Sequence, residues 1–212
     1  TVGEHLADLT SQLEKNYTDP LEQQGELWAI AAMDLKTQAY STVNAEQSMQ
    51  SASVIKAFIM AAVYDKLIYP DEGTTVSSDY ESTLKPLLTS MITVSDNESC
   101  NELVKLQTDS LDFKKGAEDI NKYLEKEGYT ETSVQHTLHP AASAQESLGG
   151  RNMTSVKDCG TLLEKIYKGE CVSKEASEEM LNLLSNQENT WKIPQGLPDG
   201  IKSANKTGET DQ

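Results

Sequence analysis

Ser53 and Lys56 lie three residues apart at the start of an apolar stretch, 54–67. On a helix this spacing puts a hydroxyl and an amine on the same face. Burial would lower the pKa of the lysine, and a neutral amine beside a serine can accept its proton as the hydroxyl attacks a carbonyl. Ser82 and Lys85 have the same spacing, but they lie in a polar stretch, so we expect the chemistry at Ser53.

Two further short motifs follow in the chain. They are Ser95-Asp96-Asn97, before a helical pattern, and Lys206-Thr207-Gly208, near the C-terminus. Their order after Ser-x-x-Lys resembles the signature of class A β-lactamases and penicillin-binding proteins. The segments 26–58, 150–163 and 196–209 are similar to that family as well, so the resemblance covers nearly the whole chain.

The resemblance implies a serine hydrolase that forms an acyl-enzyme. Ser53 would be the nucleophile, and Lys56 would take or relay its proton. Ser95 would pass a proton to the leaving nitrogen. The backbone N–H groups of Ser53 and Glu209 would form the oxyanion hole.

The same resemblance assigns the substrate-binding residues. Asn97 would hold Lys56 and the amide side chain of the substrate. Lys206 and Thr207, followed by Gly208, would bind the substrate carboxylate. The implied partner is a β-lactam or a small D-Ala-D-Ala-like molecule, with no cofactor.

The segment 136–154 departs from the family pattern. Class A enzymes carry a loop Glu that activates the deacylating water, followed four residues later by Asn, and no Glu-x-x-x-Asn occurs here. Matching "QESLG" puts Gln145 at the Glu place and Gly149 at the Asn place, whereas counting back from Arg151 gives His139. Glu146 is adjacent but is expected to point differently. Because Gln cannot accept a proton, we expect impaired deacylation.

Two other departures concern the surroundings of the cleft. Asn152 follows Arg151 where the family usually has Asp, which removes a charge expected to fix the loop. The chain between Ser53 and Ser95 is also shorter than the family norm, so one wall of the cleft should be reduced.

Hydrophobic periodicity predicts the elements that position these residues. We expect an N-terminal amphipathic helix, two strands within 26–44, a long ordered loop at 129–153 and a strand at 200–206. Helices are expected at 54–67, 87–94, 98–106, 117–124, 156–167 and 173–185.

This order predicts an α+β fold in which helices flank an antiparallel sheet and an all-helical subdomain is inserted. Residues 1–45 and 190–212 would form the α/β subdomain and 46–189 the helical one, together one β-lactamase-like domain. Since a strand at 200–206 would leave an open sheet edge, we expect further strands and a helix beyond Gln212.

Composition narrows the classes of molecule that the chain can bind. The 212 residues carry a net charge of −16, which disfavours nucleic acids and anionic membranes. The longest apolar runs are too short to span a bilayer, which takes about 18 residues. His136 and His139 lack a third ligand nearby, so no metal site is expected. The odd number of cysteines (Cys100, Cys159, Cys171) is most simply explained by buried free thiols.

The leading interpretation is therefore a β-lactamase-type hydrolase, monomeric and either secreted or anchored outside the bacterial cytoplasmic membrane, where the family's cell-wall substrates lie. The alternatives are a D-alanyl-D-alanine peptidase of the penicillin-binding type and a domain that is acylated without turnover.

Overall fold

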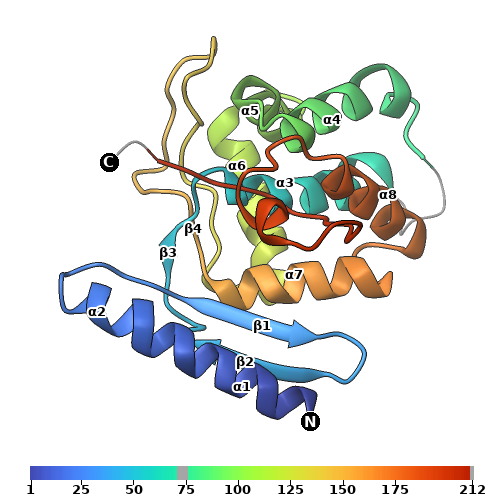
Figure 1. Ribbon diagram of the computed structural model, residues 1–212. Coiled ribbons are helices and arrows are strands. Elements are labelled where there is room, and N and C mark those ends of the chain that lie inside the picture. The colour runs from blue at the N-terminus through green and yellow to red at the C-terminus, as the bar shows by residue number, and fades with distance from the viewer. Residues whose placement is uncertain (71–75, 211–212) are drawn as a thin grey trace.

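The computed structural model describes residues 1–70 and 76–210 (Figure 1). Its α-helices are α1 (Val2–Leu13), α2 (Asp19–Glu22), α3 (Ile55–Val63), α4 (Lys85–Thr93), α5 (Asn97–Lys105), α6 (Phe113–Lys126), α7 (Val156–Lys168) and α8 (Lys174–Ser185). Its strands are β1 (Ile30–Asp34), β2 (Ala39–Val43), β3 (Met49–Gln50) and β4 (Met153–Thr154). Short 3-10 or π-helical turns are formed by Glu14–Thr18, Ala52–Val54, Tyr64–Ile68, Tyr80–Leu84 and Ile193–Gly196. The predicted α+β class is confirmed.

The N-terminal helix and the first two strands form one side of the molecule (Figure 1). A capping box between Thr1 and Glu4 begins α1, which satisfies backbone N–H groups that a helix start leaves open. Strands β1 and β2 pair antiparallel. Their turn is closed by Asp34, whose carboxylate accepts hydrogen bonds from the backbone and the hydroxyl of Thr37, both at 2.7 Å. The predicted helix and hairpin are thus confirmed.

Helix α3 lies at the centre of the helical part, with the other helices packed around it (Figure 1). All nine of its residues are buried, as expected for a helix that is apolar on every side. The predicted helices around it are also present. No helix among the described residues is long and apolar enough to cross a membrane.

The prediction of a strand at 200–206 is wrong. Residues 201–210 run in an extended path without strand pairing, and Figure 1 shows this segment crossing in front of α3. Strand β1 pairs with β2 alone in the described part of the chain. The segment instead contacts helices, through a backbone hydrogen bond from Asn205 N to Leu184 O at 3.2 Å. A strand needs a neighbouring strand to satisfy its backbone groups, and sequence pattern alone does not supply one.

Candidate active site

Ser53 and Lys56 meet at the start of the central helix. Strand β3 leads into the 3-10 turn Ala52–Val54, which passes directly into α3. Lys56 is completely buried, and its Nζ lies 3.0 Å from Ser53 Oγ. The predicted pairing of hydroxyl and amine is therefore present.

The other contacts of Lys56 indicate how it can accept a proton. Its Nζ lies 2.6 Å from the Ser95 carbonyl oxygen and 2.7 Å from Asn97 Oδ1. Both oxygens only accept hydrogen bonds, so they use the two N–H groups of a neutral amine. The lone pair is then left for the Ser53 hydroxyl. Burial lowers the pKa of Lys56, which favours this neutral form.

Ser95 lies between α4 and α5 in a strained backbone conformation, with φ +60°. Such left-handed geometry is costly for a residue other than glycine and persists where surrounding contacts hold it. Here the neighbouring Asp96 caps α5 by accepting a hydrogen bond from Ser99 N at 2.7 Å. The Ser95 hydroxyl consequently lies 3.1 Å from Lys56 Nζ and 2.9 Å from Lys206 Nζ.

Lys206 comes from the C-terminal segment that crosses α3. Besides Ser95 Oγ, its amine donates to the Thr207 carbonyl at 2.8 Å. Burial, and then repulsion from the protonated form of the neighbouring Lys56 amine, lower the pKa of Lys206 to about 7. The side chains of Ser53, Lys56, Ser95 and Lys206 thus form one hydrogen-bonded chain, although they are far apart in sequence.

Gly208 lets this segment approach the nucleophile turn. A Cβ at this position would lie 2.8 Å from the Ser51 carbonyl oxygen and 3.0 Å from Val54 N. These distances are shorter than van der Waals contact, so a side chain would push the segment away from Ser53. Thr207 is also positioned, since Asn189 Nδ2 donates to its hydroxyl at 3.3 Å.

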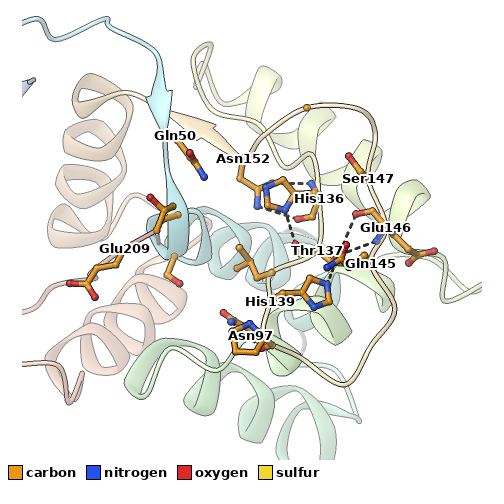
Figure 2. A pocket seen from close by; sticks show the side chains of 16 residues that line it. Gln50, Asn97, His136, Thr137, His139, Gln145, Glu146, Ser147, Asn152 and Glu209 are labelled. Carbon is orange, nitrogen blue, oxygen red and sulfur yellow. Dashed lines mark hydrogen bonds between the residues drawn. The ribbon is translucent and has the colours of Figure 1, made fainter. Parts of the chain in front are cut away.

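These residues lie beside a pocket of about 930 Å³ (Figure 2). Ser53, Asn97 and Glu209 are among its lining residues, and the loop 136–152 supplies much of the opposite wall. Figure 2 shows Glu209 at one end and Glu146 at the other, with the Glu146 side chain directed outward. A pocket of this size can hold a small-molecule ligand.

The loop candidates for water activation line the same pocket as Ser53 and are bonded within the loop. Gln145 lines the pocket next to Thr137. The Glu146 backbone N–H donates to Thr137 Oγ1 at 3.0 Å, and the same hydroxyl lies 2.9 Å from His139 Nε2. The Thr137 hydroxyl therefore connects these loop residues to one another. His136 is also engaged within the loop, through its Nδ1 at 2.6 Å from the Thr137 carbonyl oxygen.

Two buried asparagines hold this loop. Asn152 Oδ1 accepts from the backbone N–H groups of Gln135 and His136, at 2.7 and 3.1 Å, and its Nδ2 donates to the His136 carbonyl. The sequence suggests only that a charge is lost at 152, and the structure shows that the Asn152 amide itself holds the loop through three hydrogen bonds. Asn101 similarly bonds both backbone groups of Leu138.

Sequence reasoning missed Asn101 and Lys192. Asn101 lies one helical turn after Asn97 on α5, a spacing that could have placed both on the side of the helix that faces the loop, where they bond to Leu138 and Pro140. Lys192 contacts Glu209, as described below, but nothing in the sequence links the two. The second Ser-x-x-Lys pair lacks the surroundings of a nucleophile site. Ser82 is exposed, and Lys85 pairs with Glu81 at 3.0 Å.

The profile of the Beta-lactamase2 group, described as the beta-lactamase enzyme family, matches residues 12–68 and 68–212. The structure of PBP-A is similar, with TM-score 0.71 and 24% identity over 96% of this chain and 78% of that one. A beta-lactamase from Chitinophaga pinensis gives TM-score 0.69 and 23% identity, covering 86% and 73%. An ancestral class A beta-lactamase gives 0.70 and 18%, covering 96% and 80%. No curated protein sequence matches the chain.

Proposed function

Because the chain belongs to the beta-lactamase enzyme family, we propose that it is a serine hydrolase that opens β-lactam amides through an acyl-enzyme on Ser53. The observation that carries the proposal is the position of Lys56 Nζ. This atom lies within 3.1 Å of both the Ser53 and the Ser95 hydroxyl oxygens. One amine can therefore receive the proton of the nucleophile and pass a proton toward Ser95.

The acylation step follows from this arrangement. Ser53 Oγ attacks the lactam carbonyl carbon as its proton moves to Lys56 Nζ. The backbone N–H groups of Ser53 and Glu209 stabilise the oxyanion, and such a donor is worth about 3 kcal/mol of barrier. As the C–N bond breaks, the leaving nitrogen takes the Ser95 proton, which Lys56 or Lys206 replaces. Lys206 and Thr207 hold the substrate carboxylate, and Asn97 its amide.

We further propose that deacylation is slow. Hydrolysis of the ester needs a base that removes a proton from water. The Gln145 amide cannot act in this way, and the Glu146 side chain is directed outward in Figure 2. This feature also favours the second candidate, a penicillin-binding D-alanyl-D-alanine peptidase or a domain that stays acylated. Cell-wall substrates would place either protein outside the cytoplasmic membrane.

The test is a time course of intact mass after mixing the chain with benzylpenicillin, together with the loss of the free lactam. We expect an adduct of one lactam per chain that persists after free lactam is removed. Rapid return to the free mass with continued lactam loss would contradict slow deacylation. A folded sample that forms no adduct would overturn the acyl-enzyme.

The affinity for carboxylate ligands should fall as pH rises through neutrality. Because the pKa of Lys206 is about 7, its amine is a cation below that pH and neutral above it. A charged hydrogen bond to a carboxylate is lost on the alkaline side, which should weaken binding about tenfold. The measurement is the Kd of N-acetyl-D-alanyl-D-alanine across neutral pH.

Lys206→Gln provides the control for this pH dependence. The variant should bind the ligand weakly over the whole pH range, and its Kd should not change near pH 7. An unchanged pH profile in the variant would assign the titration to another group.

A further inference from the structure

Lys192 and Glu209 form an ion pair at the edge of the pocket. The Lys192 amine lies 2.8 Å from Glu209 Oε1, and the two side chains are 31% and 58% exposed. Lys192 Nζ also lies 3.4 Å from the Gly208 carbonyl oxygen and 4.9 Å from the centre of the Trp191 ring. Glu209 lines the same pocket as Ser53. The ion pair therefore joins Lys192 to Glu209, which lies on the segment that follows Lys206.

The amines of Lys56 and Lys192 are both close enough to Lys206 to act on its charge. The hydrogen bonds of Lys56 and Lys206 go to hydroxyl, amide and carbonyl oxygens, none of which is charged. The positive charge of Lys192 is close enough to contribute to the lowered pKa of Lys206. With Lys56 neutral, the cations here are Lys192 and, below about pH 7, Lys206. In a chain of net charge −16, neighbouring cations of this kind are typical of an anion-binding site.

Glu209 places a carboxylate next to these cations. Its negative charge offsets the charge of Lys192, and it opposes any second carboxylate that approaches Lys206 and Thr207. Like charges brought together at a binding site cost affinity and set specificity. The pair is partly exposed, so the expected effect is moderate.

We propose that Glu209 is a specificity-determining residue whose carboxylate occupies Lys192 and competes with the carboxylate of the ligand. The proposal rests on the proposed function, because it takes the Lys206 end of the pocket as the place where that carboxylate binds. Removing the charge of Glu209 leaves Lys192 available to the ligand. The preference for a carboxylate over a neutral group at the same position then rises.

The test compares two probes that bind without a lactam ring, N-acetyl-D-alanyl-D-alanine and its C-terminal amide. Their Kd values are measured by NMR titration at low salt for the wild-type chain and for Glu209→Gln. The ratio of amide Kd to carboxylate Kd should rise about two- to fivefold in the variant. The increase should shrink at about 1 M salt, where charges are screened within a few ångström.

Glu164→Gln is the matched control. It makes the same change of charge in another lysine pair, with Lys168 on α7, and should leave the ratio unchanged. Lys192→Met should change the ratio in the opposite direction to Glu209→Gln, because it removes a cation and leaves Glu209 uncompensated. Thermal unfolding of each variant checks that it is folded.

The possible outcomes separate this inference from the proposed function. An unchanged ratio in Glu209→Gln, an equal rise in Glu164→Gln, or no preference for the carboxylate in either the wild type or Glu209→Gln would overturn the inference. The benzylpenicillin adduct is measured separately. A chain that forms the adduct but shows no change in ratio keeps the function and loses the inference. A chain that shows the change in ratio but forms no adduct keeps the inference about Glu209 and loses the acyl-enzyme function.

Discussion

Ser53→Ala should abolish the benzylpenicillin adduct, whereas Ser82→Ala should leave its rate of formation unchanged. Ser53 Oγ lies 3.0 Å from Lys56 Nζ, and Ser53 lines the pocket. Without this oxygen there is no nucleophile at the start of α3. Intact mass after mixing with the lactam measures the adduct directly.

Ser82 makes this comparison sharp because it belongs to the other Ser-x-x-Lys of the chain. It is exposed, and its hydroxyl lies 3.4 Å from that of Thr83. An adduct that survives in Ser53→Ala would show that a different residue is labelled. Peptide mapping of that adduct would identify it.

Lys56→Met should slow acylation by about 10²- to 10⁴-fold, which is the usual contribution of a positioned base. Met keeps the length and apolar stem of the side chain but removes the nitrogen that accepts the Ser53 proton. The oxygens of Ser95 and Asn97 lose a hydrogen-bond partner, so a loss of stability of about 1–3 kcal/mol is expected as well. The observed rate constant for adduct formation, measured at a temperature where the variant is folded, gives the effect.

Lys85→Met is the corresponding surface variant. Lys85 pairs with Glu81 one turn earlier and is half exposed, so its loss should change neither the acylation rate nor, by more than about 1 kcal/mol, the stability. If Lys56→Met acylates at the wild-type rate, the proton of Ser53 must go elsewhere.

The nucleophile region could be predicted from local pattern. A helix that is apolar on every side must lie in the core. A lysine within it must therefore hydrogen-bond to nearby oxygens or lose its positive charge. Lys56 does find such oxygens, in Ser95 and Asn97. The hairpin was predictable for a similar reason, since the side chain of Asp34 closes its own turn with Thr37.

The remaining features depend on contacts between distant segments. The residues at 200–206 have an extended pattern, but a pattern does not specify what the segment pairs with. The amide of Asn152 holds the loop by bonding to the backbone of Gln135 and His136. Comparison with the family's usual Asp at this position indicates only that a charge is lost. The pairing of Lys192 with Glu209 spans a turn-rich stretch whose path cannot be read from its residue types.

Asn152 has a consequence for the behaviour of the cleft in acid. The base of the loop is held by the Asn152 side-chain amide. An amide does not gain a proton near ordinary pH, so acidification leaves its hydrogen bonds in place. Nearer the tip, the Ser143 N–H donates to Glu98 Oε2 at 2.9 Å, and this bond lowers the pKa of Glu98. That contact is present at neutral pH and is lost only once the medium is acidic enough to protonate the carboxylate. In acid the tip of this loop should accordingly lose its contact with Glu98, while the amide contacts of Asn101 with Ser143 and of Asn152 with the base of the loop stay in place.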